Sequence, residues 1–183
     1  MEQLAIIFTG GQGPKILPAT FIIPNHAYIV AADSGLDTAH RLGIQSHFAI
    51  GDFDSIQDLP LLEKLTHTRL PRKKDISDTE AALLHLREKG ISEYLLIGGG
   101  EGRFDHLLQL YSLFSSYGAP KEWITDKEHL YRVDSQRIVS IPLSSTVSFI
   151  PTHMNSHSLV TCEDLVWPLQ SFKIDSTHMS LSN

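Results

Sequence analysis

Apolar residues occur in short unbroken runs along the first two-thirds of the chain, and a glycine or an aspartate closely follows each run. A run without polar alternation is typical of a strand that is buried on both faces, as in a parallel sheet. The runs that we expect to form strands are residues 4–8, 27–32, 48–50, 94–97 and 123–125.

Segments with helical spacing lie between these runs. In the clearest one, residues 78–89, small and apolar residues recur near the spacing of one helix face. Ser77 or Asp78 can cap its start, and Gly90 can end it. The other helical segments are residues 36–42, 59–65 and 104–117. This alternation of strands and helices predicts an α/β fold with a doubly wound, mostly parallel sheet.

The pattern changes near residue 127. Beyond it, short strand-like segments are separated by polar and proline-containing stretches, and no helical period is present. Such a pattern predicts a small antiparallel β domain, a sandwich or part of one. The expected segments are residues 130–133, 137–141, 146–150, 159–162 and 165–169. We therefore expect an α/β domain in residues 1–127 and a β-sandwich domain in residues 128–183.

Composition narrows the class of protein. The 183 residues carry a formal net charge of −6, with 42% hydrophobic and 20% charged residues, as in an ordinary globular protein. A general nucleic-acid binder usually carries a basic stripe, but the basic run at residues 69–74 is short and Asp75 follows it. The apolar runs are too short for a membrane span, and the single cysteine, Cys162, excludes an internal disulfide. We expect a cytoplasmic protein that binds neither nucleic acid nor membranes.

Acidic residues follow several of the expected strands. The carboxyl ends of parallel strands form one edge of the sheet, where ligands bind. Each aspartate alone has an ordinary structural explanation, because aspartate caps helices and stabilises turns. Their occurrence beside glycines at four strand ends instead favours a single binding site. The residues concerned are Asp33, Asp52, Asp54, Asp75, Asp78 and Asp105.

Asp52 and Asp54 are the residues most indicative of a metal. In an extended segment, side chains two positions apart point to the same side, and two such carboxylates repel each other unless a cation or a proton lies between them. Mg²⁺ typically takes one or two carboxylates together with water and phosphate oxygens. The calcium-loop spacing is absent, and the ten histidines and one cysteine show no zinc spacing. The pair therefore predicts a Mg²⁺–nucleotide site.

A glycine-rich segment, residues 98–103, separates an expected strand from an expected helix. Glycines there allow backbone N–H groups to approach phosphate oxygens, and the helix N-terminus adds a favourable dipole. Arg103 can bind phosphate through two hydrogen bonds. The segment matches neither the Gly-Lys-Ser/Thr loop nor the dinucleotide fingerprint, so by itself it indicates a nucleotide only weakly. His106 can be interpreted equally well as a phosphate ligand or as an ordinary surface residue of the first helical turn.

Four segments resemble the successive motifs of the thiamine pyrophosphokinase family, in order and in spacing. The combination of Gly-Asp-Phe-Asp-Ser with Gly-Arg-Phe-Asp-His is the most specific part of this resemblance. The β-rich tail is similar to the family's thiamine-binding domain, with residues 164–169 where the family has a Gly-Leu-Lys-Tyr/Trp-Pro-Leu-like segment. The four segments are Ala32-Asp33-Ser34-Gly35, Gly51-Asp52-Phe53-Asp54-Ser55, Lys74-Asp75-Ile76-Ser77-Asp78-Thr79-Glu80 and Gly99-Gly100-Glu101-Gly102-Arg103-Phe104-Asp105-His106.

The resemblance implies transfer of the β,γ-diphosphate of ATP to the hydroxyl of thiamine, which gives thiamine diphosphate and AMP and requires Mg²⁺. It implies that Asp52, Asp54 and Asp78 hold the metal and act in catalysis with Arg103. It also implies a homodimer, with thiamine between the α/β domain of one subunit and the β domain of the other. The implied nucleotide-binding residues are Asp33, Lys74, Asp75, Gly99, Gly100, Gly102, Asp105 and His106.

The implied thiamine-binding residues are Trp167, Ser180, Ser182 and Asn183. Trp167 can stack on a thiamine ring, although a tryptophan in a β domain is more often part of the core. Family members usually continue beyond the segment that ends at Asn183, so we expect a C-terminally shortened β domain. Two other functions stay open, namely a diphosphokinase for another small alcohol and a nucleotide-binding regulator that keeps the ATP half alone.

Overall fold

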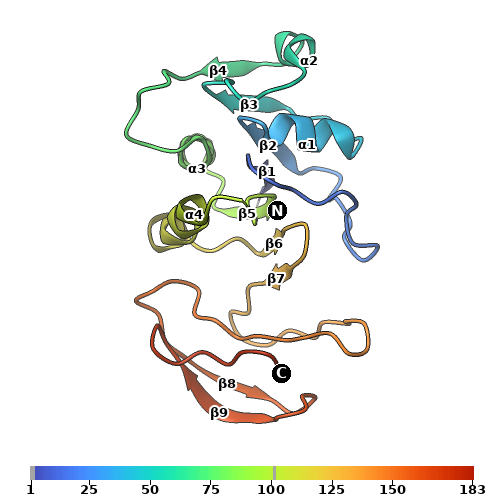
Figure 1. Cartoon of the computed structure of the whole chain (residues 1–183), viewed down its shortest axis with the longest axis vertical. Helices are drawn as coiled ribbons and strands as arrows, with labels where there is room; N and C mark the ends of the chain where they lie inside the picture. The colour runs from blue at the N-terminus through green and yellow to red at the C-terminus, as the bar shows by residue number, and fades with distance from the viewer. Residues whose placement is uncertain (1–2, 101) are drawn as a thin grey trace.

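Figure 1 shows the computed structural model, which describes residues 3–100 and 102–183. A seven-stranded sheet with helices forms most of the molecule, and a two-stranded sheet lies at the other end. The strands of the large sheet are β1 (Leu4–Phe8), β2 (Tyr28–Ala32), β3 (Phe48–Gly51), β4 (His67–Arg69), β5 (Glu93–Ile97), β6 (Glu122–Ile124) and β7 (His129–Tyr131). The helices are α1 (Gly35–Arg41), α2 (Leu59–Glu63), α3 (Asp78–Glu88) and α4 (Phe104–Tyr117). The small sheet consists of β8 (Ser158–Cys162) and β9 (Leu169–Ile174).

The large sheet has the strand order β4-β3-β2-β1-β5-β6-β7. Its strands are parallel except for β7, which runs antiparallel to β6. From β1 the chain moves outward through β2, β3 and β4, and then returns to form β5 on the other side of β1. The order therefore reverses between β1 and β5, at the kind of position where open α/β sheets bind ligands. The predicted doubly wound, mostly parallel sheet is confirmed.

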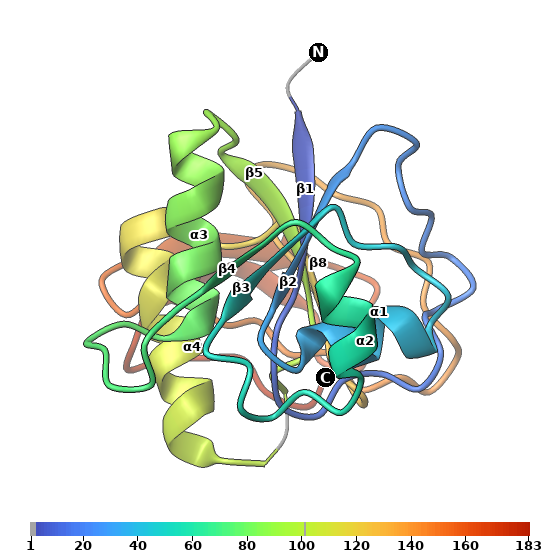
Figure 2. The ribbon, with the colours of Figure 1, turned by 90° about the horizontal axis from the view of Figure 1, so that it is seen from above.

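Helices cover both faces of this sheet, which explains the unbroken apolar runs of its strands. On one face, Ile7 of β1 belongs to the same buried cluster as Leu86 of α3 and Leu110 of α4. On the opposite face, Phe8 of β1 shares a cluster with Ala39 of α1. Figure 2 shows these two helix layers on either side of the strands. Within the described part of the chain, no helix is long and apolar enough to cross a membrane.

Helix α3 begins and ends close to the predicted positions. Ser77 is its N-cap, and the Ser77 hydroxyl accepts a hydrogen bond from the backbone N–H of Glu80 at 3.1 Å. Gly90 follows the last turn with a φ of +72°, which glycine adopts without a steric penalty. The cap therefore fixes Asp78 in the first helical turn.

The C-terminal region is less regular than the sequence predicts. β8 and β9 pair antiparallel with a bulge, and an isolated bridge joins Phe149 to Ser180. Residues 137–141, all of which the structure describes, form no strand, and residues 146–150 contribute only that bridge. These two strand predictions are wrong, and so is the one at residues 165–169, because of these residues only Leu169 lies in a strand, at the start of β9. The apolar side chain of Ile138 is 91% exposed, so its alternation with polar residues reflects no buried face.

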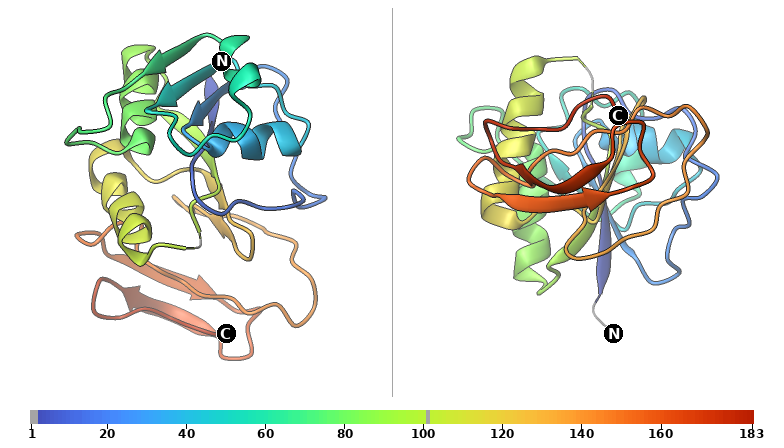
Figure 3. Two further views of the ribbon diagram at one scale, coloured as in Figure 1. Left: turned by 45° about the horizontal axis from the view of Figure 1, so that its top comes forward. Right: turned by 90° about the horizontal axis from the view of Figure 1, so that it is seen from below.

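The large sheet extends slightly beyond residue 127, because β7 pairs with β6. The remainder of the C-terminal region lies as a separate layer, as the two views of Figure 3 show. A hydrogen bond connects the layers, since the Tyr111 hydroxyl of α4 donates to the carbonyl of Pro151 at 2.9 Å. The antiparallel β region predicted after the parallel sheet is thus present, with β8 and β9 as its regular strands.

Candidate active site

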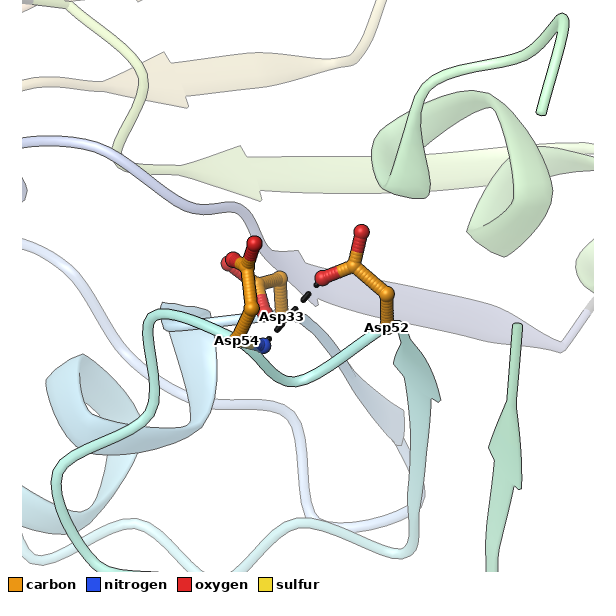
Figure 4. Close-up of side chains that lie close together, drawn as sticks. All are labelled: Asp33, Asp52 and Asp54. Carbon is orange, nitrogen blue, oxygen red and sulfur yellow. Dashed lines mark hydrogen bonds between the residues drawn. The ribbon is translucent and has the colours of Figure 1, made fainter. Parts of the chain in front are cut away.

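Three aspartates meet at the carboxyl ends of two neighbouring parallel strands. Asp33 follows β2, and Asp52 and Asp54 follow β3. One carboxylate oxygen of each lies within 4.8 Å of the others, and Figure 4 shows the three side chains grouped together. The structure therefore brings together Asp52 and Asp54 and adds Asp33, which the family resemblance assigns to nucleotide binding.

The turn that carries Asp52 and Asp54 is not the extended segment assumed from the sequence. Phe53 has a φ of +58° and is 4% exposed, so the chain turns there while the ring stays in the core. The backbone N–H of Asp54 donates to Oδ1 of Asp52 at 3.2 Å, which is the dashed line in Figure 4. Asp33 also has a positive φ, of +48°. Non-glycine residues in this conformation are uncommon and cluster at functional sites.

Gly51 allows the ends of β2 and β3 to approach each other. A Cβ atom at Gly51 would lie 3.1 Å from both the backbone N and the Cα of Asp33, which is tighter than ordinary side-chain contact. The backbone N–H of Asp33 donates to the carbonyl of Ile50 at 2.9 Å. The close approach of the Asp33 backbone therefore favours glycine at this position of the Gly-Asp-Phe-Asp segment.

Lys74 connects this cluster to helix α3. Its ammonium lies 3.1 Å from Oδ2 of Asp52 and 3.2 Å from Oδ1 of Asp78. The exposed fractions of these side chains are 12% for Lys74, 13% for Asp52 and 22% for Asp78. The structure thus places Asp78 beside Asp52 with Lys74 between them, while Asp75 in the same loop is exposed.

These charges shift the pKa values of the group. Burial acts to raise the pKa of Asp52, but hydrogen bonds from Lys74 and the Asp54 backbone hold it below its usual value. Burial raises the pKa of Asp78 above its usual value, with a contribution from Asp33 and Asp52 and with Lys74 opposing. Burial acts to lower the pKa of Lys74, yet the two carboxylates hold it above its usual value. Asp78 is therefore a better proton acceptor than Asp52.

The residues present fit a magnesium ion. Carboxylate oxygens supply the cluster, and they are the ligands that Mg²⁺ prefers. Oδ1 of Asp33 is buried and has no hydrogen-bond partner among the described residues. A buried carboxylate oxygen in that state is costly unless a cation or water reaches it. Asp33, Asp52 and Asp54 are thus suited to hold a divalent metal, with Asp78 close by.

The glycine-rich turn after β5 is fixed against the centre of the sheet. Gly98 has a φ of +98°, and a Cβ atom there would lie 2.7 Å from the carbonyl oxygen of Thr9, at the end of β1. The indole N–H of Trp123 donates to the carbonyl of Gly98 at 2.7 Å. Gly100 packs against the side chain of Thr125, where a Cβ atom would clash at 2.2 Å. The turn therefore requires glycine for close packing as well as for any approach to phosphate.

The remainder of the predicted phosphate-binding segment is exposed. Arg103 and Asp105 form a two-hydrogen-bond ion pair, which raises the pKa of Arg103 and lowers that of Asp105. Gly102 and His106 are exposed as well, and Glu101 lies outside the described residues. Asp105 thus orients the Arg103 guanidinium at the start of α4, the position predicted to meet a phosphate group.

A protein-family model described as the catalytic domain of thiamin pyrophosphokinase matches residues 20–122, which is more than half of the chain. The chain belongs to the thiamin pyrophosphokinase family. The matched residues include the three-aspartate cluster, Lys74, Asp78 and the glycine-rich turn. No curated protein matches the sequence.

Solved structures of the thiamin pyrophosphokinase family share this fold. The thiamin pyrophosphokinase of Geobacillus thermodenitrificans has a TM-score of 0.68 and 23% identity over 99% of this chain and 89% of that one. The thiamine pyrophosphokinase of Bacillus subtilis has a TM-score of 0.66 and 21% identity over 98% of this chain and 90% of that one. A family protein of Enterococcus faecalis has a TM-score of 0.64 and 19% identity, covering 100% and 88% respectively. These similarities establish the fold of the whole chain.

The residues that the thiamin pyrophosphokinase resemblance assigns to thiamine lie in the C-terminal region. Trp167 is 65% exposed, so it is a surface residue and not part of a core. Ser180 is buried, and its hydroxyl accepts a hydrogen bond from the side-chain amide of Asn183. Ser182 has a φ of +62°, and its backbone N–H donates to the hydroxyl of Ser148 at 3.2 Å. The structure thus joins Ser180 to Asn183 and leaves the Trp167 indole accessible.

One buried polar contact beside Asp78 is not evident in the sequence. The hydroxyls of Thr9 and Thr79 are hydrogen-bonded, and the two residues are 4% and 9% exposed. Thr79 follows Asp78 in α3, and Thr9 contacts the turn at Gly98. The contact therefore ties the first turn of α3 to the centre of the sheet. Its partners are 70 positions apart, so no local pattern reveals it.

Proposed function

We propose that this chain is a thiamine diphosphokinase, which transfers the β,γ-diphosphate of ATP to the hydroxyl of thiamine and releases AMP. The observation that carries the proposal is the cluster of Asp33, Asp52 and Asp54, with its buried and unpartnered Asp33 oxygen among the described residues. The cluster lies at the carboxyl edge of a doubly wound sheet. It also falls within the residues matched by the family's catalytic-domain model.

The proposed reaction requires the protein to hold a polyanion beside a neutral alcohol. When bound, Mg²⁺ neutralises phosphate charge and orients the phosphate oxygens. In our proposal, Asp33, Asp52 and Asp54 hold the metal, and Lys74 supplies a nearby positive charge on the α3 side. Arg103, oriented by Asp105, binds phosphate at the start of α4. Positioning and charge neutralisation then supply most of the acceleration.

Asp78 is our candidate for the residue that accepts the hydroxyl proton. Its raised pKa, caused mainly by burial, makes it more basic than an ordinary carboxylate. The hydroxyl oxygen of thiamine forms a bond to the β-phosphorus, while the bond from that phosphorus to the oxygen bridging the α-phosphate breaks. AMP leaves with the bridging oxygen, and the hydroxyl proton passes to Asp78. The N-cap at Ser77 holds Asp78 in place through this step.

We also propose that residues 1–127 bind ATP and metal, and that residues 128–183 bind thiamine in a homodimer with a shared site. Large apolar side chains on the C-terminal region support this assembly, because Ile138, Leu143 and Val166 are 91%, 98% and 77% exposed. Light scattering after gel filtration should give twice the chain mass of 20.4 kDa. A monomer at assay concentrations would contradict the shared site.

The central test replaces one metal ligand. Wild type and Asp54→Ala are incubated with ATP, thiamine and Mg²⁺, and AMP and thiamine diphosphate are quantified by chromatography. Asp54→Ala should lower turnover about 100-fold or more, the range seen when a preorganised electrostatic contact is lost. Asp54 is exposed, so its replacement should leave folding intact. Glu63→Gln, which removes an exposed carboxylate from α2, should retain wild-type turnover.

Three other outcomes of this test would contradict a part of the proposal. Turnover of Asp54→Ala near the wild-type rate would show that the metal assignment is wrong. AMP formation with another small alcohol but not with thiamine would change the acceptor. ATP binding by calorimetry, without thiamine binding or AMP release, would identify a non-catalytic nucleotide-binding protein.

A further inference from the structure

Lys74 lies in the position of a cation between two carboxylates. Its ammonium contacts Oδ2 of Asp52 and Oδ1 of Asp78 at 3.1 and 3.2 Å. The other oxygen of Asp52, Oδ1, accepts the backbone N–H of Asp54. Both oxygens of Asp52 therefore already have partners. A metal ion can bind Asp52 directly in only two ways. It either replaces one of these partners, or it shares a carboxylate oxygen with that partner.

The charges around Lys74 make sharing unfavourable. The Lys74 side chain is 12% exposed, so water screens its interactions with neighbouring charges only weakly. A divalent ion bound by Asp33, Asp52 and Asp54 would place two positive charges close to the ammonium. The repulsion between the ion and the ammonium opposes metal binding for as long as Lys74 stays between the two carboxylates.

Nucleotide phosphates change this balance. Lys74 belongs to the loop at residues 70–77, in which Arg72, Lys73 and Asp75 are exposed. Its ammonium sits on a flexible four-carbon chain, so it can turn away from Asp52 without a change in the strands. Phosphate oxygens bound beside the metal would offer the ammonium new anionic partners. Lys74 can then leave Asp52 without becoming an unpaired buried charge.

We propose that Lys74 is an internal counter-ion of Asp52 and Asp78 that competes with free divalent metal for Asp52, and that nucleotide phosphate draws it away. This inference rests on the proposed function, because it takes Asp33, Asp52 and Asp54 as the metal ligands. Lys74 is then a positioning residue that makes metal and nucleotide bind cooperatively. By linkage, the nucleotide strengthens metal binding by the same factor as the metal strengthens nucleotide binding.

The experiment measures metal binding without turnover. Free Mn²⁺ is followed by electron paramagnetic resonance as it is titrated into wild type, Lys74→Met and Lys73→Met, first alone and then with a non-hydrolysable ATP analogue. Lys74→Met should bind Mn²⁺ alone about tenfold more tightly than wild type, within the usual range of coupling free energies. Lys73→Met removes a neighbouring exposed charge and should stay within about twofold of wild type.

The analogue provides the second readout. The analogue should increase the Mn²⁺ affinity of wild type and of Lys73→Met strongly. The factor of this increase should be about tenfold smaller in Lys74→Met. Mn²⁺ affinity in Lys74→Met equal to or weaker than that of wild type would overturn the inference, and so would undiminished coupling to the analogue. Lys74→Gln repeats both measurements with a polar side chain, so that a folding defect of one variant leaves the inference testable.

A further variant separates this inference from the proposed function. Wild type should bind Mn²⁺ in the presence of the ATP analogue, whereas Asp54→Asn should not. If Mn²⁺ binding is lost in Asp54→Asn while Lys74→Met behaves like wild type, the metal site stands and the counter-ion role of Lys74 is wrong. If Asp54→Asn binds Mn²⁺ as tightly as wild type, the metal assignment fails, and the role of Lys74 fails with it.

Discussion

The large sheet and the C-terminal region differ in how completely they bury their apolar residues. Ile7 and Leu96, on adjacent central strands, are 0% and 1% exposed, whereas Leu143 and Trp167 are 98% and 65% exposed. Helices cover both faces of the large sheet, while the C-terminal sheet has two strands, an arrangement that is marginal by itself. The residues proposed to bind metal and nucleotide thus rest on a sheet that helices cover on both faces. Those proposed to bind thiamine rest on a region that leaves much apolar surface exposed.

Matched truncations of leucine should show this difference most strongly. Leu96→Ala removes a side chain that is 1% exposed and leaves a cavity, so it should lower the free energy of unfolding by about 2–5 kcal/mol. Leu143→Ala removes a side chain that is 98% exposed and should change it by less than about 0.5 kcal/mol. Urea denaturation followed by circular dichroism measures both. A cost for Leu143→Ala similar to that of Leu96→Ala would mean that the C-terminal surface is covered in solution, as in a dimer.

Replacement of the buried threonine pair tests how the site is attached to the sheet. Thr9→Val keeps the side-chain shape but leaves the Thr79 hydroxyl without its partner, so it should cost about 1–3 kcal/mol in the free energy of unfolding. Thr9→Val combined with Thr79→Val removes both hydroxyls and should recover part of that loss. Thr9→Ser retains a hydroxyl and should be the mildest change. Equal costs for the single and double valine variants would show that the Thr79 hydroxyl carries no burial penalty when it lacks its partner.

Trp167 allows the C-terminal region to be tested for function separately from stability. Trp167→Ala should raise the KM for thiamine about fivefold to thirtyfold, because an aromatic face over a cationic ring contributes about 1–2 kcal/mol. The KM for ATP should change little, and so should the free energy of unfolding, since the indole is 65% exposed. Steady-state kinetics with each substrate varied in turn measures this. An unchanged KM for thiamine would remove Trp167 from the proposed site.

The same contrast explains how far the sequence predicts the structure. The strands β1, β2, β3 and β5 are buried on both faces, so their apolar runs predict them almost to the residue. Helix α4 occupies the predicted residues 104–117 for the same reason, as its apolar face packs on the sheet. Apolar positions of the C-terminal region carry less information, because residues such as Ile138 are not buried. The strand predicted at residues 137–141 is therefore absent from this described segment.

The sequence predicts which residues form the candidate site better than it predicts how they are arranged. Parallel strands that end in aspartate predict that Asp33, Asp52 and Asp54 lie at one edge, and they do. The ion contacts of Lys74 with Asp52 and Asp78 depend on the path of the loop before α3. Phe53 combines a left-handed backbone conformation with a buried ring. Neither feature leaves a periodic signal, because both arise from packing between distant segments.

The smallest predicted effect compares one titrating group in each region. His85 of α3 stacks on Phe48 with ring centroids 4.0 Å apart, and its Nε2 lies 3.0 Å from the Tyr28 hydroxyl. Burial lowers the pKa of His85, with Lys89 adding to this and Glu88 opposing it. In the C-terminal region, hydrogen bonds from Thr177 and Lys173 lower the pKa of Asp175.

The sign of each effect follows from which state binds more protons. The unfolded chain binds a proton at His85 more readily than the folded chain does, so the His85 contribution to stability decreases as the pH falls below about 6.5. Asp175 stabilises the folded state above its unfolded pKa, and that contribution is lost only as the pH falls through the acidic range below about 4. Urea denaturation between pH 7.5 and 5.5 should therefore show a weaker pH dependence in His85→Gln than in wild type. Asp175→Asn should keep the wild-type slope, because the Asp175 carboxylate of wild type stays ionised in the folded and the unfolded chain across that pH range. If His85→Gln also keeps that slope, the stacked ring of His85 titrates no differently from an exposed histidine. The contrast in burial between the two regions would then not extend to α3.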